Sequence, residues 1–117
     1  MLRPILFALL LAAASPVAAG SPIVEAVAAR EGADGWRFDV TVSHGDTGWD
    51  HYADAWRIES MDGQELGVRI LMHPHVTEQP FTRSLSGVPV PDGAREVVVR
   101  ARDSVHGWGA PYVVTLR

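Results

Sequence analysis

Two histidines that could bind one ligand flank a proline in the segment His73–Pro74–His75. The ring of Pro74 disfavours a helical conformation at the residue before it, so the chain is expected to be extended there. Side chains two residues apart in an extended chain point to the same side. The two imidazoles are therefore predicted to converge, with the carboxylate of Glu78 a few residues further on.

Other potential ligands lie far away in the sequence, so the fold must bring them near. The remaining histidines are His44, His51 and His106. Imidazole is the commonest metal ligand in proteins, and carboxylates can complete its shell or orient it. Four carboxylates occur in the same stretches as the histidines: Asp46, Asp50, Glu78 and Asp103.

Short strands separated by turns are the elements expected to position these residues. Apolar and polar residues alternate from Trp36 to Ser43, a period of two that indicates a strand with one buried face. Asp62–Gly63 is typical of a hairpin turn. Strands are predicted at 23–29, 36–43, 55–60, 65–72, 81–88, 95–102 and 112–116. This all-β pattern predicts a seven-stranded antiparallel sandwich of the immunoglobulin or fibronectin type III kind.

Strand order predicts where the histidines lie. Successive connections in an antiparallel sandwich alternate between its two ends, so the three histidine-bearing loops belong to the same end. The turns at the opposite end contain no histidine. Each histidine alone could serve packing or a turn, but together they favour a metal site. The candidate metal ligands are His44, His51, His73, His75, His106 and Asp103.

The donor types restrict the metal. The chain has no cysteine, so the donors are imidazole nitrogen and carboxylate oxygen. This set suits Cu(II), Zn(II) or Fe(II) and argues against a thiolate cluster or a calcium cage. We expect one transition-metal ion, copper or zinc with iron as the alternative, in a protein that carries metal or maintains its homeostasis.

Two segments resemble motifs of the superoxide reductase (desulfoferrodoxin) iron domain: 44–52, which runs from His-Gly-Asp to His-Tyr, and 103–108, Asp-Ser-Val-His-Gly-Trp. That domain is an immunoglobulin-like sandwich with iron held by four histidines and a cysteine. The resemblance implies His44, His51 and His106 as ligands. Asp103 stands where that family has its cysteine, and superoxide reduction depends on the cysteine thiolate. We therefore expect a metal carrier, with a superoxide-reductase-like iron redox protein as an alternative.

A second resemblance gives a grouping without a function. The His-Pro-His segment with the Glu-Gln-Pro-Phe-Thr-Arg-Ser that follows it is similar to segments of uncharacterised exported bacterial proteins. The same holds for Asp-Ser-Val-His-Gly at 103–107. We predict membership of such an exported immunoglobulin-like family.

Aromatic residues at the histidine-bearing end favour a different class of function. Trp49, Tyr52 and Trp108 could form a patch that holds a protein or a carbohydrate. A hydrolase is the third class of function considered, since Ser84 or Ser104 could act as a nucleophile. It ranks last because neither serine lies in a Gly-x-Ser-x-Gly elbow.

The N-terminal segment predicts export. Residues 1–19 combine a basic start, an apolar run and a small-residue cleavage site, which is typical of a secretory signal peptide. Residues 20–117 are then expected to form one periplasmic or secreted domain. The net charge is −4 and no basic stripe occurs, so nucleic acid is not an expected partner. No later segment is apolar for long enough to span a membrane. The expected partners are a metal ion and another periplasmic protein.

Overall fold

A computed structural model describes residues 20–116, which form two packed antiparallel sheets. The predicted signal peptide lies outside the described residues, and its assignment stays a prediction. The strands are β1 (Ile23–Gly32), β2 (Gly35–Ser43), β3 (Ala53–Glu59), β4 (Glu65–Ile70), β5 (Phe81–Val88), β6 (Glu96–Asp103), β7 (Gly107–Trp108) and β8 (Tyr112–Thr115).

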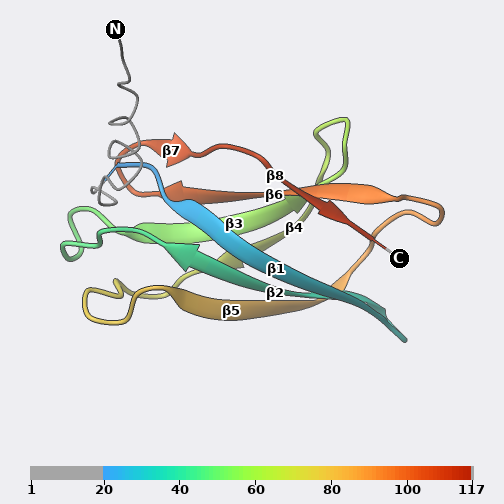
Figure 1. Cartoon of the computed structure of the whole chain (residues 1–117), viewed down its shortest axis with the longest axis horizontal. Coiled ribbons are helices and arrows are strands. Elements are labelled where there is room, and N and C mark those ends of the chain that lie inside the picture. Colours follow the sequence, from blue (N-terminus) through green and yellow to red (C-terminus); the bar gives the residue numbers. More distant parts are fainter. Residues whose placement is uncertain (1–19, 117) are drawn as a thin grey trace, which may run out of the picture.

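The sheets contain three and five strands (Figure 1). The smaller has the order β1-β2-β5. The larger has the order β4-β3-β6-β7, with β8 beside β6. Residues 20–116 form no helix, and so contain none that is long and apolar enough to cross a membrane. Residues 20–116 therefore form an all-β sandwich, as the strand pattern predicts.

One hydrophobic core lies between the sheets. The alternation predicted along β2 is present, because Phe38, Val40 and Val42 are fully buried while their neighbours are more exposed. Trp56 of β3 and Val99 of β6 are also fully buried and belong to the same core cluster. Burial of large apolar side chains from both sheets is the main force that holds them together.

The prediction of seven strands is wrong, because residues 20–116 form eight. The additional strand, β7, lies within the segment expected to be the last loop. Gly107 has a φ of +82° and lets the chain return at once beside Asp103. Pro111 then has no backbone N–H to donate, so the edge strand breaks and resumes as β8 at Tyr112. The finer assignment to the immunoglobulin or fibronectin type III kind stays a prediction.

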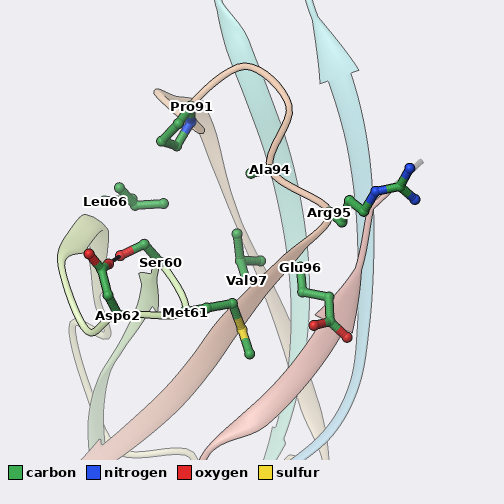
Figure 2. A pocket seen from close by; sticks show the side chains of 9 residues that line it. All are labelled: Ser60, Met61, Asp62, Leu66, Pro91, Ala94, Arg95, Glu96 and Val97. Carbon is green, nitrogen blue, oxygen red and sulfur yellow. Dashed lines mark hydrogen bonds between the residues drawn. The ribbon is translucent and has the colours of Figure 1, made fainter.

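The two ends of the sandwich differ in chemistry. The loops that follow β2, β4 and β6 all lie at one end, on the left in Figure 1. A cavity of about 350 Å³ lies near the opposite end, between the β3–β4 turn and the segment that leads into β6 (Figure 2). Met61, Pro91 and Val97 line it, and none of its lining residues is a histidine.

Candidate metal site

Hydrogen bonds join the three histidine-bearing loops. The backbone N–H of Ser104 donates to the carbonyl oxygen of Tyr52 at 2.9 Å, and Tyr52 N–H donates to Ser104 Oγ at 3.1 Å. Gln79 connects the loop before β5 to the loop after β2, because its Oε1 accepts from His44 N–H at 3.0 Å. Within its own loop, its Nε2 donates to the His75 carbonyl at 2.8 Å. The loops are therefore one connected structure, which fixes the relative positions of their side chains.

Asp103, the last residue of β6, lies at the centre of this end and is 1% exposed. Its Oδ2 lies 3.1 Å from His44 Nε2, 2.9 Å from His51 Nε2 and 2.8 Å from His106 Nδ1. Its Oδ1 accepts hydrogen bonds from the backbone N–H groups of Val105 and His106. One carboxylate oxygen thus faces three imidazole nitrogens from two loops.

The environment of Asp103 keeps it ionised. Burial alone raises the pKa of its carboxyl group. Hydrogen bonds from the backbone and ring of His106, the ring of His51 and the backbone of Val105 outweigh burial and hold that pKa well below its usual value. A carboxylate kept negative in a buried position is a suitable ligand for a cation.

His44 is buried between two carboxylates. Its Nδ1 lies 2.5 Å from Asp46 Oδ1. Its Nε2 lies 2.7 Å from the carbonyl oxygen of Gly20 and 3.1 Å from Asp103 Oδ2. Both ring nitrogens therefore face oxygen atoms.

Asp46 holds His44 in this orientation. Asp46 Oδ1 also accepts from Ala53 N–H at 3.0 Å, and Oδ2 accepts from His75 N–H at 2.7 Å. A carboxylate that accepts a hydrogen bond from the Nδ1–H of a neutral histidine leaves Nε2 unprotonated and free to bind, the arrangement common around metal-ligating imidazoles. Asp46 is thus a positioning residue with all its hydrogen bonds formed inside the protein.

Three side chains form a group with the spacing of metal ligands. One potential ligand atom each from His44, His51 and Asp103 lies within 4.8 Å of the other two. His106 is not part of this group, although its Nδ1 touches Asp103, and its side chain is more exposed. Within residues 20–116 this is the single such group of three.

His73 and His75 lie at the same end but do not join that group. Their rings are 4.6 Å apart, so they converge as the extended segment predicts. The ring of His75 stacks on Phe81 with centroids 3.8 Å apart, and its Nε2 lies 2.9 Å from Arg83 Nη2. Because arginine only donates, His75 Nε2 must accept and is not free to bind a metal. His73 is exposed.

The surroundings of His75 favour its neutral form. Burial, the positive charge of Arg83 and the nearby His73 lower its pKa, and Glu78 and Asp46 oppose them only in part. Its Nδ1 is buried without a hydrogen-bond partner among the described residues. His75 thus contributes packing and a backbone contact to Asp46.

The aromatic residues named in the sequence divide between two places. Trp49 is 67% exposed and meets Tyr52 edge-on, with ring centroids 5.5 Å apart. Trp108 lies on the larger sheet, with the guanidinium of Arg57 at 4.0 Å and that of Arg102 at 5.1 Å from its ring. The exposed aromatic surface at this end is therefore the Trp49–Tyr52 pair.

Two contributors were not found from the sequence. Gly20 brings a backbone oxygen to His44, and Arg83 determines the hydrogen bonding of His75. The position of Gly20 just after the predicted cleavage site was an available signal. Arg83 gave no signal, because its meeting with His75 depends on how the loop folds against β5.

A curated protein of Halomicrobium mukohataei, described as "Putative lipoprotein", is 48% identical to this chain over 77 residues. The match covers 66% of this chain and 37% of that protein. The chain thus spans little more than a third of the relative's length. Neither a protein-family model nor a solved structure matches the chain.

Proposed function

We propose that this protein is an exported metal carrier that holds one transition-metal ion between His44 Nε2, His51 Nε2 and Asp103 Oδ2. The observation that supports this most strongly is the surroundings of His44. Its Nδ1 faces Asp46 while its Nε2 faces two further oxygens. A neutral imidazole has a single N–H, so a positive centre beside Nε2, either a second ring proton or a metal ion, is needed.

A metal ion provides that centre more simply than protons do. His51 Nε2 faces the same Asp103 oxygen, so protons would have to be placed on two neighbouring rings whose centroids are 4.8 Å apart. The distances from Asp103 Oδ2 to the two nitrogens, 3.1 and 2.9 Å, are close to the ~3.3 Å between ligand atoms that ~2.0 Å bonds produce around a tetrahedral ion. One ion is proposed to bind all three groups, with the ring nitrogens of His44 and His51, which lie within 4.8 Å of each other, drawn toward it.

Nitrogen and oxygen donors make copper or zinc the proposed metal. The order of divalent affinities favours Cu(II). Two histidines and one carboxylate also form the set that many Fe(II) enzymes use, so iron is the alternative. Asp103, in the position of the superoxide reductase cysteine, supports holding and passing on a metal rather than reducing superoxide, since a carboxylate donates less electron density than a thiolate.

Export to the periplasm or beyond is part of the proposal. It is supported by the signal-like composition of residues 1–19 and by a relative whose printed name is that of a lipoprotein. A carrier in that compartment passes its metal to another exported protein.

The exposed Trp49–Tyr52 pair favours a second candidate, an interaction module. Large aromatic side chains on loops are common anchors for a protein or a sugar. In this alternative the histidines have structural roles and metal does not change the behaviour of the protein.

The test combines metal titration with matched double variants. The full-length gene is expressed without a tag, the exported protein is stripped of metal, and Zn(II) and Cu(II) are added in a calorimeter. We expect one ion per chain. His44→Ala with His51→Ala should weaken binding by more than about a hundredfold, since outer partners alone are worth about tenfold to a hundredfold. His73→Ala with His75→Ala should retain binding within about tenfold.

Controls keep this result interpretable. Circular dichroism verifies that each variant is folded, and His51→Ala alone is the fallback, because His51 is less deeply buried than His44. Equal affinity in the two double variants would contradict the proposed ligand set.

A further inference from the structure

We propose that the α-amino group and carbonyl oxygen of Gly20 complete the metal site once the leader is removed after Ala19. This inference rests on the proposed function. The carbonyl oxygen of Gly20 lies 2.7 Å from His44 Nε2, the nitrogen that also faces Asp103. The first described residue of the chain thus places a polar backbone atom directly among the proposed ligands.

The segment that begins with Gly20 is held against the larger sheet. Pro22 is buried. Gly109 lies between β6 and this segment: a Cβ there would lie 3.3 Å from the Ala101 carbonyl oxygen, a tight approach, and 3.4 Å from that of Pro22. Gly109 N–H in turn donates to Ala101 at 2.7 Å. Gly20 is therefore anchored beside the site only two residues from a buried position.

An amino-terminal glycine in this position is a chelating ligand. Its α-nitrogen and its own carbonyl oxygen form a five-membered ring with a metal ion. Together with His44, His51 and Asp103 they supply three nitrogen and two oxygen donors, a set that suits Cu(II). Two donors on one residue bind more tightly than separate ones, because the second binds at a high effective concentration.

Removal of the leader controls this chemistry. While Ala19 is attached, the nitrogen of Gly20 is an amide, which has no free lone pair for a metal at neutral pH. Hydrolysis of the Ala19–Gly20 peptide bond consumes one water, leaves the carboxylate on Ala19 and converts the nitrogen of Gly20 to a free amine. The complete site therefore forms only on the exported, processed protein, and the metal it takes is the one present outside the cytoplasm.

The composition of the chain makes a selective test simple. No lysine occurs, since all ten basic residues are arginines, so the processed protein has its α-amine as the single primary amine. An acetylating reagent specific for amines then blocks one known atom on the folded protein. Mass spectrometry verifies that the chain begins at Gly20 and carries one acetyl group, and Cu(II) is titrated into both forms.

We expect acetylation to weaken Cu(II) binding by about a hundredfold, the order of effect that loss of a linked second donor produces. Bound Cu(II) should also protect the α-amine from the reagent. Equal affinity before and after acetylation, or a mature chain that begins elsewhere, would overturn this inference and leave the three-ligand site standing. Absence of Cu(II) and Zn(II) binding in every form would instead overturn the proposed function.

Discussion

Two groups of histidines share one end of the sandwich but have opposite partners. His44 and His51 point nitrogens at a buried carboxylate oxygen, whereas His75 points one at the guanidinium of Arg83. His44 and His75 are both buried, at 2% and 4% exposure. Burial and residue type therefore do not distinguish a proposed metal ligand from a packing residue. The atom that each ring nitrogen faces distinguishes them.

Asp46 connects the two groups and has a different role in each. It orients the ring of His44 through a side-chain contact, but holds only the backbone N–H of His75. The carboxylate thus fixes one imidazole as a potential ligand and positions the loop that carries the other. Changes at Asp46 and at His75 should separate the two roles.

Of the two changes, Asp46→Asn is expected to have the larger effect, a loss of metal affinity. The side-chain amide of asparagine replaces one accepting carboxylate oxygen with an NH₂ group. This group faces N–H donors and cannot accept from them, so the orientation of His44 is lost. Zn(II) affinity should fall by about tenfold to a hundredfold, measured by calorimetry. The matched control is Asp50→Asn in the same loop, which makes the same charge change at an exposed position and should leave the affinity unchanged.

Equal losses in the Asp46 and Asp50 variants would show that general charge, rather than the orientation of His44, governs binding. The free energy of unfolding is measured alongside. Asp46→Asn should also cost about 1–3 kcal/mol, because it leaves buried donors without acceptors.

The smaller effect concerns pH and His75. Its pKa in the folded protein is lowered by burial, Arg83 and His73, so below about pH 6.5 the unfolded chain binds the proton more readily. Stability should therefore decrease as the pH falls from about 6.5 toward that lower pKa, by at most about 1.4 kcal/mol per pH unit for this group. Urea unfolding in EDTA should show a flatter decrease for His75→Phe than for the wild type. Parallel pH curves for the two proteins would contradict this role.

Much of the fold was predictable because its signals are local. The alternation from Trp36 to Ser43 and the Asp62–Gly63 turn depend on neighbouring residues, and the structure has a strand and a turn there. Strand β7 was missed because it is two residues long and depends on the turn at Gly107 and the break at Pro111.

The site was predictable only in outline. Strand order placed all five histidines at one end, because connections alternate between ends whatever the side chains do. It could not divide them into two groups, since that depends on the stacking of His75 on Phe81 and on the reach of Arg83. Such contacts are set by tertiary packing and leave no periodic pattern in the sequence.

The ring nitrogens themselves report whether His44 and His51 bind the metal. Long-range proton–nitrogen NMR spectra of ¹⁵N-labelled protein report each imidazole nitrogen with and without one equivalent of Zn(II). We expect the signals of Nε2 of His44 and Nε2 of His51 to shift together on Zn(II) addition, while those of the His73 and His75 nitrogens stay in place. Shifts at His73 and His75 with unchanged signals from His44 and His51 would contradict this expectation.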